Sequence, residues 1–274
     1  MFRTRVISSV VLVILALVTI LGGGYLLAAT LLFLALIAYR ELMKACKLSG
    51  EGKKLSPLEI NGYLGILAYY LVMVFVPDRI YLFLTVVLIL IGFMFIYVFS
   101  FPKYHSDQIM TAFFCVAYAP VMLSFIYLVR ALPYGVYTVW MIFISSWICD
   151  TCAYLTGICI GKHKLAPILS PKKSIEGAIG GILGSAIVGA LYGYFVVEGV
   201  VVEQNITWVF VVISAVGAVI SQVGDLAASA IKRNQEIKDY GKLIPGHGGV
   251  MDRFDSVIFT APMIYFLTLL LIRA

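Results

Sequence analysis

Charged side chains are scarce in this sequence. Asp, Glu, Lys and Arg make up 12% of the 274 residues, hydrophobic residues make up 62%, and the mean hydropathy is +1.03. Because a soluble domain carries about 25% charged residues, this composition excludes a water-soluble globular protein. A bilayer core about 30 Å thick requires roughly 20 apolar residues per helix, so the chain has room for roughly eight to ten membrane spans and no separate soluble domain.

Cysteine is also sparse, and its pattern favours neither disulfides nor zinc. The number of cysteines is odd, and each lies in or next to an apolar run. Cys149 and Cys152 form a C-x-x-C, but the sequence has no second pair and no histidine at the spacing of a zinc site. We interpret all of them as small buried side chains: Cys46, Cys115, Cys149, Cys152 and Cys159.

The apolar runs predict an all-α integral membrane protein with nine transmembrane helices in a single polytopic domain, residues 1–274. The first run follows a basic head, as in a signal peptide, but the many later runs favour a retained helix. Residues 1–135 hold spans without an assigned role, and residues 136–274 hold the polar motifs. The expected spans are Val6–Leu21, Tyr25–Tyr39, Ile60–Val76, Ile80–Phe99, Met110–Val129, Val136–Ile160, Gly177–Val197, Trp208–Ala228 and Phe254–Ile272.

Lysine and arginine are distributed unevenly between the segments that join these spans. If the N-terminus is cytoplasmic, 17 of the 20 basic residues fall on the cytoplasmic side, and only Arg79, Arg130 and Arg273 fall outside. Cytoplasmic loops carry such an excess, so we expect the N-terminus inside and the C-terminus outside. The basic balance therefore needs no nucleic-acid partner.

The seventh expected span carries a small residue at every fourth position. Such a ridge lets two helices approach closely, and the second helix can come from this chain or from the other subunit of a homodimer. The ridge consists of Gly177, Gly181, Ser185, Gly189 and Gly193.

A basic segment follows the sixth span. We expect Ser170 and Ser174 to lie at the cap and first turn of a helix, beside Lys172 and Lys173. A helix N-terminus with two neighbouring ammonium groups suits a phosphate. The alternative is a loop that only touches lipid headgroups.

Two aspartates occupy apolar surroundings. If the eighth span continues as a helix to Arg233, Asp225, Ser229 and Lys232 share one face, and Asp225 lies about two turns inside the membrane boundary. An ionised group there is costly unless it is paired or binds a cation. Asp150, within another span, raises the same question, and for both a structural ion pair is the alternative.

The segment IPGHGGVMDRFDS precedes the last span. Gly246, Gly248 and Gly249 flank His247 and allow backbone N–H groups to approach an anion closely. Asp252 and Asp255 follow, three residues apart. Carboxylates beside a phosphate-binding loop favour Mg²⁺, which takes carboxylate and substrate phosphate oxygens.

Together these residues resemble the phosphatidate cytidylyltransferases, also called CDP-diacylglycerol synthases. The segments DTCAY from Asp150, GKHKLAP from Gly161 and SPKKSIEG from Ser170 are similar to further family segments. The sequence departs from the family at Ala228, where many members have Glu. The family pattern S-x-x-K-R-x4-K-D-x-G-x2-I-P-x-H-G-G-x2-D-R-x-D is matched by Ser229, Lys232, Arg233, Lys238, Asp239, Gly241, Ile244, Pro245, His247, Gly248, Gly249, Asp252, Arg253 and Asp255.

The resemblance implies condensation of CTP with phosphatidic acid to give CDP-diacylglycerol and pyrophosphate, with Mg²⁺ required and a second cation left open. It implies a bacterial cytoplasmic (inner) membrane enzyme whose site faces the cytoplasm and meets membrane lipid. Catalytic roles fall to Lys173, Asp225, Asp252 and His247, and metal binding to Asp225, Asp252 and Asp255. The expected substrate-binding residues are Ser170, Lys172, Ser174, Ser229, Lys232, Arg233, Lys238, Asp239, Gly246, Gly248, Gly249 and Arg253.

Two other functions are compatible with parts of this pattern. A CTP-dependent polyprenol kinase would transfer the γ-phosphoryl group to an alcohol and release CDP. A transporter could use Asp150 and Asp225 as ion sites, but it needs no His-Gly-Gly loop, and the halves of the sequence show no evident inverted repeat. The CDP-alcohol phosphatidyltransferases are disfavoured because their D-G-x2-A-R-x8-G-x3-D-x3-D pattern is absent.

Overall fold

A computed structural model describes residues 2–50, 54–200, 205–244 and 248–272. Among these residues, eight helices are long and apolar enough to cross a membrane. The helix α1 (Phe2–Gly22) precedes them, with a shorter apolar stretch over Val10–Gly22. The protein is therefore an all-α, multi-pass integral membrane protein, as the sequence predicts, whereas its orientation in the membrane stays a prediction. The five cysteines are free thiols: Cys115 and Cys149 are buried, as expected, Cys46 and Cys152 are half-buried, and the expectation is wrong for Cys159, which is exposed.

The chain divides into two compact units, which we describe separately. Unit 1 comprises Met1–Tyr127 and Gln235–Arg253, and unit 2 comprises Leu128–Asn234 and Phe254–Ala274. The glycine-rich segment before the last span thus belongs to the same unit as the N-terminal helices.

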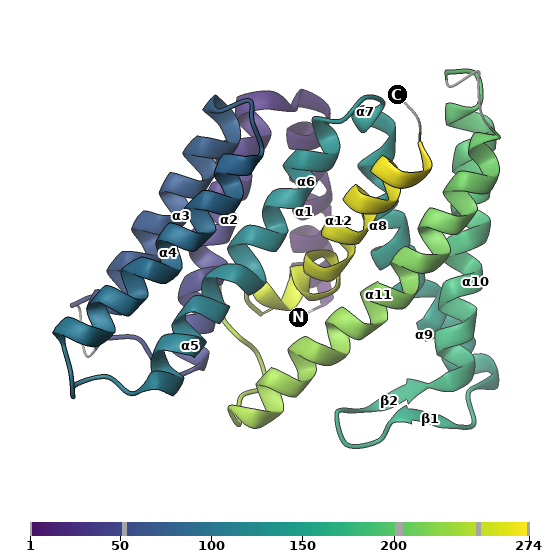
Figure 1. Cartoon of the computed structure of the whole chain (residues 1–274). Coiled ribbons are helices and arrows are strands. Elements are labelled where there is room, and N and C mark those ends of the chain that lie inside the picture. The colour runs from purple at the N-terminus through teal and green to yellow at the C-terminus, as the bar shows by residue number, and fades with distance from the viewer. Residues whose placement is uncertain (1, 51–53, 201–204, 245–247, 273–274) are drawn as a thin grey trace. The chain divides into compact units, whose positions relative to one another are not determined.

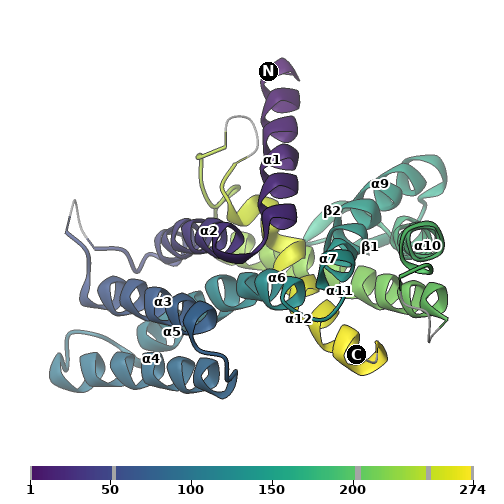
Figure 2. The same cartoon turned by 90° about the horizontal axis from the view of Figure 1, so that it is seen from above.

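Unit 1 is built from α1, α2 (Gly24–Ala45), α3 (Pro57–Phe75), α4 (Ile80–Phe99), α5 (Ser106–Val116) and the π-helical turn η1 (Ala117–Val121). Figure 2 shows α3, α4 and α5 lying along one another. Large side chains without exposed surface fill the core, among them Tyr39, Leu42, Met43, Phe93 and Ile109. In η1 the wider π turn contains Pro120, which has no N–H group to donate to the preceding turn.

The second span is longer than the sequence predicts. We expected it to end at Tyr39, but α2 continues to Ala45. Polar Arg40 and Glu41 indicated the end of the apolar run, yet Glu41, Leu42 and Met43 continue the buried face of the helix. The predicted span ended too early because the backbone groups that bind Glu41 lie far away in the sequence.

Unit 2 contains α7 (Gly135–Thr138), α8 (Trp140–Phe143), the π turn η2 (Ile144–Ile148) and α9 (Cys149–Ile160), which together form one span. A two-stranded hairpin, α10 (Ile175–Tyr192) with the π turn η3 (Gly193–Val197), and α11 (Ile206–Asn234) follow. The helix α6 (Met122–Arg130) joins the units, and α12 (Met251–Leu271) begins in unit 1 and continues in unit 2. Figure 1 shows α9 and α10 next to the hairpin.

The small-residue ridge packs within this chain. Gly177, Gly181, Ser185 and Gly189 are buried on α10. A Cβ atom at Gly181 would lie 2.9 Å from the carbonyl oxygen of Cys149 on α9, and one at Gly189 would lie 3.0 Å from that of Phe210 on α11. The ridge therefore lets α9 and α11 approach α10 within unit 2, and a homodimer stays a prediction.

The basic segment forms an antiparallel hairpin rather than a loop. Strand β1 (Lys164–Ala166) pairs with β2 (Ser170–Ser174). Ser174 is the N-cap of α10, as predicted, and its hydroxyl accepts a hydrogen bond from Gly177 N at 3.1 Å. The expectation that Ser170 lies at the helix start is wrong, because its backbone pairs with Ala166 at the far end of the strand.

We expect Gly181→Val to destabilise unit 2. The added atoms would meet the Cys149 carbonyl oxygen and sulfur, both 2.9 Å from the position of a Cβ atom. Overpacking of this kind costs about 1–3 kcal/mol. The thermal unfolding temperature of detergent-purified protein measures the loss. Ile187→Phe adds bulk at an exposed position of the same helix and should leave that temperature unchanged, so equal stability of the two variants would contradict the packing.

Candidate active site

An ion pair joins the hairpin to the long helix α11 in unit 2. Lys173 on β2 donates to a carboxylate oxygen of Asp225 on α11, and both side chains are about a quarter exposed. The partner that a charge at this depth requires is thus a lysine 52 residues earlier in the chain. The sequence singled out both residues but did not pair them.

Two further carboxylates share the surroundings of Asp225. Asp255 on α12 interacts electrostatically with Asp225, Asp150 and Lys232, and Asp150 on α9 interacts with Asp225 and Lys173. We call Asp150, Asp225 and Asp255 the acidic cluster. It gathers three carboxyl groups near Lys173 and Lys232.

Asp150 is exposed although it lies in the span Gly135–Ile160. A charged side chain facing lipid at such a depth is costly, and membrane proteins direct such groups toward a water-filled cavity or the protein interior.

A glycine allows α11 and α12 to approach where the acidic cluster forms. A Cβ atom at Gly224 would lie 3.0 Å from the carbonyl oxygen of Asp255 and 2.9 Å from Phe259 Cβ. Close packing at this position brings the backbone turn that carries Asp255 against the turn that carries Asp225. The amide of Gln222 donates to Ala178 O at 3.0 Å, which ties α11 to α10 nearby.

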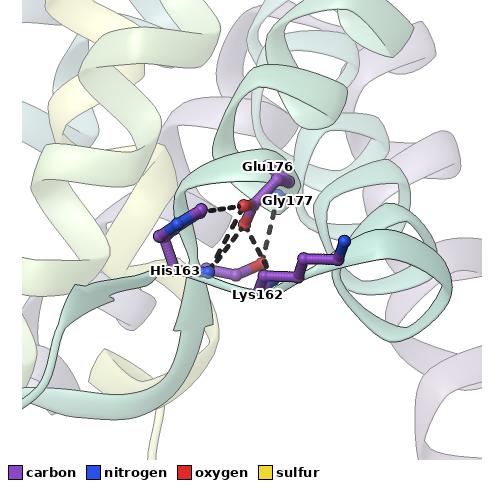
Figure 3. A network of polar contacts seen from close by, with 5 residues as sticks. Lys162, His163, Glu176 and Gly177 are labelled. Carbon is purple, nitrogen blue, oxygen red and sulfur yellow. Dashed lines mark hydrogen bonds and ion pairs between the residues drawn. The ribbon is translucent and has the colours of Figure 1, made fainter.

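The base of the hairpin is held by Glu176 in the first turn of α10 (Figure 3). Its carboxylate accepts hydrogen bonds from the N–H groups of Lys162 and His163, at 3.1 and 3.2 Å, and lies 2.6 Å from His163 Nδ1. Ile175 N donates to His163 O at 2.9 Å. These contacts fix the junction between β2 and α10, and so they fix the position of Lys173 on β2. Sequence reasoning gave Glu176 no role.

The glycine-rich segment is organised around Asp252 in unit 1. Asp252 Oδ2 accepts from Tyr240 N at 2.9 Å and from Gly249 N at 3.0 Å. Gly248 has φ +87°, which favours glycine, and a Cβ atom there would lie 2.8 Å from Asp252 Oδ2. The N–H group of Gly249 thus has a partner inside the protein, and a contact between this glycine and a phosphate stays a prediction.

Sequence reasoning missed Glu41, which holds the same segment from α2. Its two carboxylate oxygens accept from Val250 N and Met251 N. The only signal in the sequence is a glutamate at the end of an apolar run, and nothing local relates it to residues about 210 positions away.

The other predicted residues are distributed over both units. The helix α11 extends to Asn234, so Ser229 and Lys232 continue the face of Asp225, as expected. His247 and Gly246 lie outside the described residues. The remaining predicted basic or acidic positions are exposed: Lys172, Arg233, Lys238, Asp239 and Arg253.

The donor set of the acidic cluster fits a hard cation. Asp150, Asp225 and Asp255 offer carboxylate oxygens, the donors that Mg²⁺ prefers. In the described part of the chain, no group of three His, Cys, Asp or Glu side chains is drawn together closely enough to hold an ion. Lys173 now occupies one carboxylate oxygen of Asp225, so binding requires the cluster to tighten.

The carboxylates of the acidic cluster lie on membrane helices, and lysines of the hairpin and of α11 lie near them in an integral membrane protein. The chain belongs to the Cytidylyltransferase family, whose model matches residues 3–271. It is 33% identical over 267 residues to a phosphatidate cytidylyltransferase of Staphylococcus epidermidis, covering 96% of this chain and 97% of the relative. It is also 33% identical over 280 residues to that of Staphylococcus aureus (99% and 100%), and 31% identical over 265 residues to that of Staphylococcus saprophyticus (96% and 97%).

We expect Glu176→Ala to loosen the hairpin while the helices stay intact. The N–H groups of Lys162 and His163 would lose their acceptor, so the backbone of β1 and β2 should exchange hydrogen faster. Hydrogen exchange followed by mass spectrometry measures this. Glu198→Ala removes another carboxylate, one that accepts from Thr207, and should leave the hairpin unchanged. Unaltered exchange in Glu176→Ala would show that the clamp does not hold the hairpin.

Proposed function

We propose that this protein is a phosphatidate cytidylyltransferase, which transfers the cytidylyl group of CTP to phosphatidic acid and forms CDP-diacylglycerol and pyrophosphate. The observation that carries the proposal is the family match over residues 3–271, with relatives of that name aligned over 96% or more of the chain. The location of carboxylates on apolar helices, with lysines of the hairpin and of α11 near them, supports it, because a lipid headgroup must meet a water-soluble nucleotide at the membrane.

The reaction places its demands on binding and charge rather than on a protein nucleophile. A phosphate oxygen of phosphatidic acid attacks the α-phosphorus of CTP, and pyrophosphate leaves. The protein must hold two polyanions together and stabilise the negative charge that develops between them. Lys173 on β2 and Lys232 on α11 supply positive charge beside the acidic cluster in unit 2, and Lys172 adds an exposed positive charge on the same strand.

Asp225 and Asp255 would hold Mg²⁺, and Asp252 stays a predicted ligand from the sequence. The ion would supply positive charge to the reacting phosphates when bound. Lys173 would orient Asp225 through their ion pair and also contact a substrate phosphate. We further propose that the site faces the cytoplasm of a bacterium, where CTP is available.

The alternatives have less support. A polyprenol kinase or an ion-coupled transporter would not account for relatives of one name over the whole chain. The kinase also differs in a measurable way, because it would place the γ-phosphorus of CTP in the lipid product.

The position of the label in the products tests the reaction class. Purified protein in detergent receives phosphatidic acid, Mg²⁺ and CTP labelled at either the α- or the γ-phosphorus. We expect α-label in the lipid fraction and γ-label in pyrophosphate. Entry of γ-label into lipid, or no transfer to phosphatidic acid by folded protein, would overturn the proposal.

We expect Asp225→Asn and Asp255→Asn each to lower kcat by about 100-fold or more, with the residual activity requiring more Mg²⁺. An amide keeps the size of the side chain but weakens a hard-cation site, and each ~1.4 kcal/mol of lost transition-state stabilisation is tenfold in rate. Asp255→Asn leaves the Lys173–Asp225 pair intact and so separates metal binding from loss of the ion pair.

Asp107→Asn, at an exposed position of α5, serves as the control for these two variants. Steady-state kinetics at several Mg²⁺ concentrations measure the effects. Wild-type rates and Mg²⁺ dependence in both cluster variants, together with an inactive His247→Ala, would place the essential group at the histidine instead.

A further inference from the structure

Glu41 is a buried carboxylate that the reaction scheme above does not use. It lies near the end of α2 and is 7% exposed. Its Oε1 accepts from Val250 N at 3.1 Å and its Oε2 from Met251 N at 2.9 Å, across a separation of about 210 residues. All of these residues belong to unit 1. A long-range contact of this kind fixes one segment relative to the helix that carries the acid.

The contacted segment closes around the carboxylate. We define the glycine segment as Tyr240–Ile244 together with Gly248–Asp252. A Cβ atom at Gly241 would lie 2.7 Å from Glu41 Cδ, and one at Gly249 would lie 2.6 Å from it. Gly241 and Gly249, one in each part of the segment, therefore leave the space that the Glu41 side chain fills. The fit is specific in shape, because any larger side chain at either glycine would displace the acid.

The charge of Glu41 also suits its position. Val250 and Met251 are at the start of α12, where N–H groups lack partners within the helix and the helix dipole favours negative charge. Asp252 takes two other N–H groups of the segment, those of Tyr240 and Gly249. Glu41 and Asp252 thus engage the consecutive amides of residues 249, 250 and 251, so these amides anchor the segment to unit 1.

Both oxygens of Glu41 are needed for this arrangement. Each oxygen accepts from a different backbone N–H group. A glutamine would present an oxygen to one of them and an NH₂ group, which only donates, to the other. A buried N–H group would then face a donor, so the amide cannot reproduce the contact although it has nearly the same shape.

We propose that Glu41 is a positioning residue for CTP: it holds the glycine segment in the conformation that binds the nucleotide phosphates, although it does not touch the nucleotide itself. The proposal rests on the cytidylyl transfer proposed above. It gives the N-terminal half of the chain a role in substrate binding, carried by one side chain on the second span.

The chain offers a matched control in Glu59 on α3. Glu59 is 3% exposed, belongs to the same unit, and accepts from two backbone N–H groups, those of Gly50 and Ser56, each at 2.8 Å. Both hydrogen bonds go to its Oε2, so a glutamine can keep them. Glu59→Gln therefore removes a buried negative charge of unit 1 without disturbing the glycine segment.

The test compares Glu41→Gln with Glu59→Gln by kinetics and by hydrogen exchange. We expect Glu41→Gln to raise the KM for CTP by about tenfold or more, with kcat and the KM for phosphatidic acid changed less than about twofold, because lost ground-state and transition-state binding affects KM alone. A peptide covering residues 248–253 should exchange faster. Glu59→Gln should change none of these quantities. Glu41→Asp, which keeps the charge but shortens the reach, should fall between wild type and Glu41→Gln.

The outcomes separate this proposal from the proposed function. Unchanged exchange in Glu41→Gln would show that Glu41 does not hold the segment. If Glu41→Gln exchanged faster but had the same KM for CTP as Glu59→Gln, the conformation of the segment would not affect CTP binding. If wild-type protein formed no CDP-diacylglycerol, the proposed function would fail, and the role in CTP binding with it, whereas the exchange result would still report on the contact.

Discussion

Burial of carboxylates in an apolar protein is the constraint on which the described structure depends. A carboxylate removed from water needs hydrogen-bond donors or a cation, because its solvation cannot otherwise be replaced. Asp225 obtains Lys173 from the hairpin, Asp252 obtains the N–H groups of Tyr240 and Gly249, and Glu41 obtains those of Val250 and Met251. The partners of Asp225 and Glu41 come from distant parts of the sequence within the same unit, so satisfying these two acids also sets the local fold.

The carboxylates of the two units have different kinds of partner. This difference suggests a structural role for the acids of unit 1 and a role in the reaction for those of unit 2. In unit 1 the oxygens of Glu41 and Asp252 accept from backbone N–H groups of the glycine segment, which suits these two acids to holding that segment in place. In unit 2 the acidic cluster of Asp150, Asp225 and Asp255 lies near the side chains of Lys173 and Lys232. We propose that this cluster binds a cation, which would supply positive charge to the two polyanionic substrates.

The sequence predicts the helices because composition and apolar runs suffice for them. It also identifies Asp225 and Asp255 as candidate site residues, because charged residues in or beside such runs are conspicuous. It does not predict the hairpin, since Ser170–Ser174 contains a proline and two lysines and lacks strand-like alternation. It also fails to end α2 correctly, because Glu41 is acceptable in a buried helix only through a partner about 210 residues away. Local pattern identifies candidate residues, whereas pairing depends on the tertiary fold.

Direct detection of a metal ion at the acidic cluster tests the central claim most closely. Mn²⁺ can replace Mg²⁺ in oxygen-ligand sites and is visible by electron paramagnetic resonance. Detergent-purified protein with a non-hydrolysable CTP analogue should bind Mn²⁺ in a form that Mg²⁺ displaces, and the Asp225→Asn/Asp255→Asn double variant should lose this signal while remaining folded. Equal Mn²⁺ binding by the folded double variant and the wild type would contradict the assignment of the cluster as the metal site.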